Sequence, residues 1–131
     1  MSDYTIRRVD EVADAFGGKY PGAMRFLSEP LGTTQVAFTH RVMPPQSGGK
    51  GSYGHRHKTQ EEVYFVLSGT LQFKLEDEVV EVPSGTVVRV APDVTRSVWN
   101  DGPGEAELVI VSPRVADVRE DVEFVQDFWP A

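Results

Sequence analysis

The residues best suited to chemistry lie within one short segment. His55 and His57 are two positions apart in a stretch too rich in glycine for a helix, so both side chains should project to the same face of an extended strand. Glu62 follows at the start of a β-branched and aromatic run. Two imidazoles and one carboxylate on neighbouring strands form a ligand set for a divalent transition metal with positions open for a substrate. We therefore predict that these three residues are metal ligands, with Fe, Mn, Ni or Zn as the candidate ions.

Strand patterns that would position these residues begin near residue 34. One strand carries apolar residues and a histidine at every second position: Val36, Phe38, His40 and Val42. A second alternates in the same way: Leu71, Phe73 and Leu75. Short strands of this kind, joined by Gly, Pro and Asp turns, predict an antiparallel β-sandwich or barrel. We expect one domain, with the barrel at about residues 34–113 and terminal arms at 1–33 and 114–131.

The two arms carry weaker signals. A short helix is predicted at residues 10–16, before the Gly17-Gly18 pair. Near the C-terminus, valines recur at a spacing of three to four: Val115, Val118, Val122 and Val125. This spacing forms an apolar stripe among acidic residues. We expect the stripe to dock on the barrel of its own chain or of a partner, because an acidic polar face is repelled by membranes.

One strand predicts a covered outer surface. If Glu62 faces the interior, then Val63, Phe65 and Leu67 face outward. A lone barrel would carry polar residues there. The N-terminal arm or a second subunit would provide the cover, and together with the apolar arms this predicts a homodimer.

Composition limits the classes of partner and compartment. The 131 residues carry a formal net charge of −7, with 40% hydrophobic and 25% charged residues. This charge argues against nucleic acid and anionic membranes as partners, since both require a basic surface. There is no cysteine, so disulfides and thiolate ligands are excluded. The absence of an apolar run of membrane-spanning length and of a basic leader predicts a cytoplasmic protein.

The spacing of these residues resembles the first motif of the cupin superfamily, which reads Gly, His-x-His, Glu, Gly. The matching residues are Gly49, His55, His57, Glu62 and Gly69. The second motif is matched in part, with Gly85 and Asn100 at the expected separation. Three of its positions differ and hold Ala91, Asp93 and Arg96. The resemblance implies a single cupin-type jelly-roll barrel that binds a small molecule.

Arg96 stands where the family usually has a fourth metal ligand, a histidine. Arginine cannot ligate a metal, because it stays protonated and offers only donors. In one interpretation Arg96 turns away and His55, His57 and Glu62 bind the metal alone. In the other, Arg96 pairs with Glu62, the site is metal-free, and Arg96 clamps a carboxylate or phosphate. The retention of both histidines and the glutamate favours the first.

Two further residues are candidates for the substrate pocket. Tyr64 would fill the barrel with its hydroxyl near the site, and His40 lies on the apolar face of its strand. There is no phosphate-binding loop and no arrangement for nucleophilic catalysis. A metal-dependent enzyme, dioxygenase-like or isomerase-like by the resemblance, is therefore the main functional hypothesis. The alternative is a non-catalytic binding module for an anionic small molecule.

Overall fold

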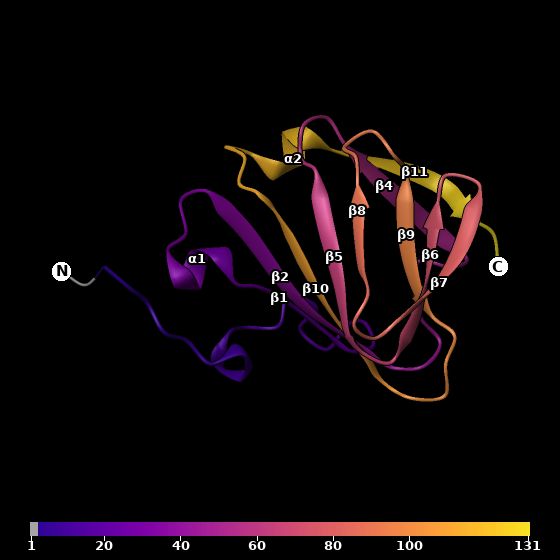
Figure 1. Cartoon of the computed structure of the whole chain (residues 1–131), viewed down its shortest axis with the longest axis horizontal. Helices are drawn as coiled ribbons and strands as arrows, with labels where there is room; N and C mark the ends of the chain where they lie inside the picture. The colour runs from indigo at the N-terminus through magenta and orange to yellow at the C-terminus, as the bar shows by residue number, and fades with distance from the viewer. Residues whose placement is uncertain (1–2) are drawn as a thin grey trace.

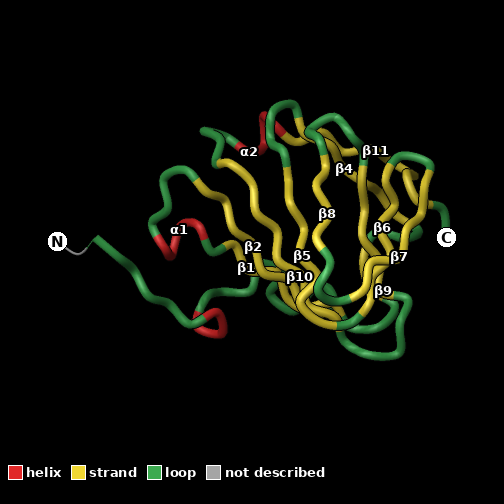
Figure 2. Tube along the Cα trace, viewed as in Figure 1, coloured by secondary structure: helices red, strands yellow, loops and turns green. Residues whose placement is uncertain are grey.

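The computed structural model describes residues 3–131, which form two antiparallel β-sheets packed face to face (Figures 1 and 2). The first sheet has the strand order β1-β2-β10-β5-β8, made of Ala23–Phe26, Val36–Met43, Ala106–Pro113, Glu62–Ser68 and Val87–Val90. The second has the order β11-β4-β9-β6-β7, made of Val122–Trp129, Ser52–His57, Arg96–Asn100, Thr70–Leu75 and Glu78–Pro83. The short β3 (Ser47–Gly48) pairs with β9. This topology confirms the predicted all-β jelly-roll.

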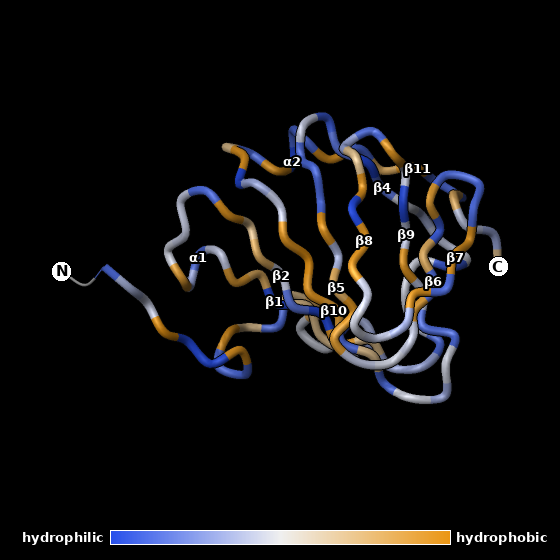
Figure 3. The backbone as a smooth tube through the Cα atoms, in the orientation of Figure 1, coloured by the Kyte–Doolittle hydropathy of each residue, from blue (hydrophilic) through white to orange (hydrophobic). Residues whose placement is uncertain are grey.

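The hydrophobic core lies between the two sheets and draws residues from both. Its members are Met43, Tyr64, Val66, Leu71, Phe73, Val82, Val90, Val98, Ala106 and Leu108. The Tyr64 and Phe73 rings meet edge to face across the core, with centroids 5.3 Å apart. Hydrophobic colour runs along much of β10 in Figure 3, consistent with a strand that has neighbours on both sides.

Among residues 3–131, helical structure is confined to three single turns. These are η1 (Val9–Glu11), α1 (Ser28–Leu31) and α2 (Val118–Asp121). The helix predicted at residues 10–16 was therefore wrong apart from the η1 turn, because Asp14 instead accepts backbone hydrogen bonds from Phe16 and Met24. Within residues 3–131, no helix is long and apolar enough to cross a bilayer.

The C-terminal stripe docks on its own barrel, but as a strand. Residues 122–129 form β11, which pairs antiparallel with β4 at the edge of the second sheet. The pairing satisfies the edge backbone groups of β4. Of the four valines of the stripe, Val122 and Val125 lie in the docked strand, whereas Val118 is 52% exposed. With β1 at the other end, the sheets extend beyond the predicted range of 34–113.

The apolar face of β2 points outward. His40 pairs with Val109, which in turn pairs with Phe65, so the three side chains share one face. Tyr64, one residue from Phe65, is buried on the opposite face. Arg41 therefore points to the interior. Alternation alone could not reveal this, since both faces of the sheet carry apolar residues.

The outward face of the first sheet is only partly covered. Exposed fractions are 38% for Val63, 43% for Leu67 and 64% for Val87. Val63, Phe65 and Leu67 were predicted to face outward, and they do, with Phe65 half-buried. The N-terminal segment leaves the sheets and extends away from them in Figure 1, with Tyr4 and Ile6 exposed. In this chain alone, that segment does not bury the patch formed by Val63, Leu67 and Val87.

Candidate metal centre

The two histidines of β4 lie on the same face, as predicted. Their rings are edge to face, with centroids 5.1 Å apart. Gly54 occupies the opposite face of the strand, where a Cβ atom would stand 2.4 Å from the Phe128 ring and 2.8 Å from the Arg96 carbonyl oxygen. A glycine at this position lets β4 lie close to β9 and the C-terminal strand. The backbone that carries His55 and His57 therefore packs closely against β9 and the C-terminal strand.

Glu62 completes a group of three possible ligands. Its Oε1 atom lies 3.4 Å from His55 Nε2 and 3.6 Å from His57 Nε2. One ligand atom from each residue lies within 4.8 Å of the other two. We call His55, His57 and Glu62 the His-His-Glu cluster. His57 is buried, whereas the His55 side chain keeps 31% exposure, so the cluster is open to solvent on the His55 side.

A carboxylate from the C-terminal segment orients His57. Asp121 Oδ2 lies 3.1 Å from His57 Nδ1, and Asp121 also accepts hydrogen bonds from the Thr59 hydroxyl and the Thr59 and Gln60 amides. Burial alone would raise the pKa of Asp121, but these hydrogen bonds lower it overall. An ionised Asp121 accepts a hydrogen bond from Nδ1–H of His57 and holds the ring so that Nε2 points toward Glu62.

Arg96 is fully buried and faces inward. Its Nη1 donates to the carbonyl oxygens of Val94 at 2.7 Å and Pro92 at 3.1 Å. Its Nη2 donates to Glu62 Oε1 at 2.9 Å. Arg96 therefore does not turn away from the cluster, but pairs with its glutamate. Most of its donors are used by protein acceptors.

Tyr64 belongs to the same network. Its hydroxyl donates to Glu62 Oε1 at 2.6 Å and accepts from Arg96 Nε at 3.3 Å. Burial and the neighbouring Glu62 charge raise the pKa of Tyr64, which keeps the phenol protonated and able to donate. For Glu62 itself, burial favours a higher pKa, but hydrogen bonds from His55, His57 and Tyr64 hold the pKa well below its usual range. The carboxylate is therefore anionic at any ordinary pH.

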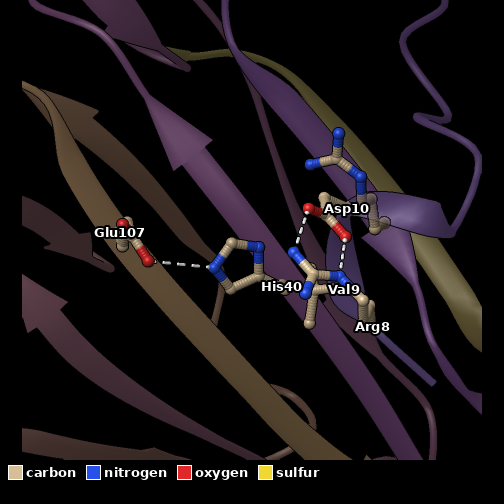
Figure 4. A pocket seen from close by; sticks show the side chains of 6 residues that line it. Arg8, Val9, Asp10, His40 and Glu107 are labelled. Atoms are coloured by element: carbon tan, nitrogen blue, oxygen red, sulfur yellow. Dashed lines mark hydrogen bonds and ion pairs between the residues drawn. The ribbon is translucent and has the colours of Figure 1, made fainter.

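His40 lies apart from the His-His-Glu cluster. On the outer face of the first sheet, its Nε2 lies 3.1 Å from Glu107 Oε2 (Figure 4). It lines a pocket of about 500 Å³ together with Arg8, Val9, Asp10, Arg25 and Glu107. Of the residues proposed from sequence, the structure brings together His55, His57, Glu62, Tyr64 and Arg96, and leaves out His40.

Beside the cluster, two aromatic residues border an open hollow. Tyr53 lies on the histidine face of β4, and Phe124 of β11 pairs with His55. Their rings meet edge to face, 5.3 Å between centroids, and with Gln126 they line a pocket of about 250 Å³. We call Tyr53 and Phe124 the aromatic wall. Sequence reasoning missed Phe124 and Asp121, because only the β11–β4 pairing brings them to the site. It also missed Tyr53, although strand alternation places Tyr53 on the face of His55.

The donor set fits a divalent transition metal. Two imidazoles and one carboxylate are ligands that Fe, Mn, Ni and Zn accept. His55, His57 and Glu62 would hold the ion, and Asp121, Tyr64 and Arg96 would orient those ligands. The Arg96 guanidinium opposes binding by charge, but it contacts the glutamate rather than the open side of the cluster.

The fold and the cluster define an all-β jelly-roll with a potential histidine–carboxylate centre. Residues 41–112 match the family model described as "Cupin domain". This range covers more than half of the chain. The protein therefore belongs to the cupin family, as its motif spacing predicted.

Solved structures show the same fold. A sugar phosphate isomerase of the cupin superfamily from Silicibacter pomeroyi aligns over 97% of this chain and 96% of its own, with a TM-score of 0.74 and 17% identity. A cupin protein from Bacteroides fragilis aligns over 89% of both chains, with a TM-score of 0.70 and 22% identity. A predicted oxalate decarboxylase from Thermotoga maritima aligns over 85% of this chain and 100% of its own, with a TM-score of 0.68 and 24% identity. No curated protein matches the sequence.

Proposed function

We propose that this cupin binds a divalent transition metal through His55, His57 and Glu62 and uses it to act on a small molecule. The observation that supports this most strongly is the convergence of three ligand atoms within 4.8 Å. Fe, Mn, Ni and Zn are the candidate ions. The partly exposed His55 side leaves room for a substrate to approach.

A metal there would act as a Lewis acid on a chelating oxygen or, if redox-active, support dioxygen chemistry. The residues of this chain have separate tasks. Asp121 fixes the His57 tautomer, while Tyr64 and Arg96 hold the Glu62 carboxylate. An isomerase-like or dioxygenase-like reaction is the class we favour. Similar folds in proteins described as a sugar phosphate isomerase and a predicted oxalate decarboxylase are compatible with an enzyme.

A second candidate function follows from the Arg96–Glu62 contact of 2.9 Å. Here the arginine replaces the metal as the positive charge beside Glu62, and the protein is a non-catalytic binding module for an anionic small molecule. Nη2 of Arg96 donates one hydrogen bond to Glu62, and its other N–H group would donate to the anionic ligand.

Metal content distinguishes the two functions. Protein purified without chelator, analysed by mass spectrometry for Fe, Mn, Ni and Zn, should carry up to about one ion per chain. The double variant His55→Ala/His57→Ala should carry none, whereas His40→Ala, outside the cluster, should match the wild type. Wild-type protein that holds none of the four ions, even after each is added, would reject the metal-dependent function in favour of the binding module.

We also propose that the functional form is a homodimer. The exposed residues Val63, Leu67 and Val87 share one outer face, and a second copy would bury them. Light scattering at micromolar concentration should give twice the chain mass. Replacing Leu67 and Val87 by Asp should give the single-chain mass. A wild-type protein of single-chain mass would contradict the proposal.

A further inference from the structure

A second interior arginine, Arg41, differs sharply from Arg96. Arg41 lies on β2, where it pairs with Leu108, and Leu108 pairs with Val66. Both of these neighbours are completely buried. Cross-strand partners share a face of the sheet, so Arg41 projects to the interior side among core residues. Arg41 itself is half-buried, and a polar atom in its buried part requires a hydrogen-bonding partner.

Arg41 lacks such a partner in the described part of the chain. Its Nε atom is buried, and nothing within residues 3–131 accepts a hydrogen bond from it. Among the ion pairs of those residues, none includes Arg41. Its guanidinium stands 5.8 Å from the Phe16 ring centroid, which offers an aromatic face but no acceptor oxygen. Burial lowers the pKa of Arg41, although an arginine remains protonated in proteins.

The strand register places Arg41 on the same interior face as a residue of the site. Leu108, the partner of Arg41, pairs with Val66, and Tyr64 lies two residues before Val66 on the same face of β5. Tyr64 hydrogen-bonds Glu62 of the His-His-Glu cluster, and Tyr53 belongs to the aromatic wall on the histidine face of β4. Arg41 thus faces the interior from the first sheet, while the histidines and the aromatic wall face it from the second.

We propose that Arg41 is the anion-binding residue of the ligand site, and that the ligand is a carboxylate or phosphate carrying a planar or apolar body. The anionic group would take the donors of Arg41 in a bidentate contact. The body would pack on Tyr53 and Phe124, whose exposed fractions are 49% and 60%. This inference rests on the proposed function, which places the ligand in the interior. Arg41, and not Arg96, is assigned to bind the anionic group, because most donors of Arg96 are used by protein acceptors.

Calorimetric titration with three small probes tests this proposal. Benzoate, phenyl phosphate and the neutral benzamide share an aromatic body and differ in the attached group. Wild-type protein should bind at least one anion about tenfold or more tightly than benzamide, and the better anion identifies the carboxylate or phosphate class. Arg41→Met should lose about tenfold or more of that affinity. Arg89→Met, which removes an exposed arginine of the same sheet, should lose none.

Thermal unfolding without ligand separates binding from a structural role. If Arg41 serves a ligand, Arg41→Met removes an unpaired interior charge and should unfold at a higher temperature than the wild type. If Arg41→Met folds poorly, Arg41→Lys is the deciding variant, because it keeps the charge but loses the bidentate geometry. Several-fold weaker binding of the preferred anion by this variant supports the proposal, and unchanged binding overturns it.

The titrations should be run on chelator-treated protein and again with added Zn²⁺. Dependence on Arg41 in the chelated protein supports the anion site even if metal analysis rejects the metal-dependent function. Three results would overturn the proposed role of Arg41. These are no binding of either anion by wild-type protein in the millimolar range, equal affinity of wild-type protein for benzamide and the anions, and wild-type affinity of Arg41→Met for the preferred anion.

Discussion

Two histidine–carboxylate pairs in this molecule have the same separation and different surroundings. His57 Nδ1 lies 3.1 Å from Asp121, and His40 Nε2 lies 3.1 Å from Glu107. Asp121 is buried and accepts three more hydrogen bonds, whereas the Glu107 side chain is 41% exposed. The decisive difference lies at the other ring nitrogen. In His57 it faces Glu62, and in His40 it is buried without a partner among residues 3–131.

The comparison teaches that a histidine–carboxylate contact does not by itself mark a functional site. A carboxylate that orients one nitrogen is useful only if the other nitrogen points to something that can be bound. The inner pair meets this condition because β5 brings Glu62 to it. The outer pair does not, and variants of the two pairs should therefore behave differently.

The largest effect is expected at Glu62, which has no equivalent in the outer pair. Glu62→Gln removes the anion from buried Arg96, leaving an uncompensated charge, and should lower the free energy of unfolding by about 3–5 kcal/mol. It should also abolish metal binding. Urea denaturation and metal analysis provide the measurements, with Glu107→Gln as the matched control. Similar losses in both variants would remove the distinction between the two pairs.

Asp121 should have the next largest effect. Asp121→Ala frees the His57 ring to change tautomer and orientation, so affinity for a divalent metal should fall by roughly 10–100-fold. Glu107→Ala should leave metal affinity unchanged. Competition titration with a chromogenic chelator measures both. An Asp121→Ala protein with wild-type affinity would show that the C-terminal carboxylate does not support the site.

Arg96→His should have the opposite effect to Asp121→Ala and strengthen metal binding. It removes the opposing charge and supplies a possible fourth ligand, so metal affinity should rise by about tenfold or more. The same titration tests it. Unchanged affinity would mean that position 96 does not project toward the ion.

The last expected effect concerns pH, measured on chelator-treated protein. The pKa of Glu62 is lowered in the folded protein, so its stabilisation is present above the unfolded-state pKa of about 4.3 and declines as pH falls below it. The stability advantage of the wild type over Glu62→Gln should shrink by about 1.4 kcal/mol per pH unit in that range. A constant difference down to pH 2 would argue against a depressed pKa.

The sequence predicted the all-β fold and the grouping of His55, His57 and Glu62, because local spacing determines which side chains share a face of a strand. Arg96 was placed near Glu62 by its motif position, but its direction was left open. The anchoring carbonyls of Val94 and Pro92 depend on a turn whose shape is not evident from residue types.

The remaining features depend on pairing between distant strands. Asp121 is 64 residues from His57, and no local pattern connects them. The valine spacing of the C-terminal segment predicted a docking stripe, but not the strand that pairs with the open edge of the second sheet. His40 was placed on the wrong side of its strand relative to the cluster because the outer face of this sheet is itself apolar.

The position of Asp121 also has a consequence for the order of events during synthesis. The ribosome produces His55, His57 and Glu62 well before the residue that fixes the His57 ring. Until about 60 further residues have emerged and β11 has paired with β4, the nascent chain has the three residues of the cluster but not the final orientation of His57. Long-range strand pairing is among the slower steps in folding. If the chain binds a metal as proposed, loading should therefore follow completion of the sheet.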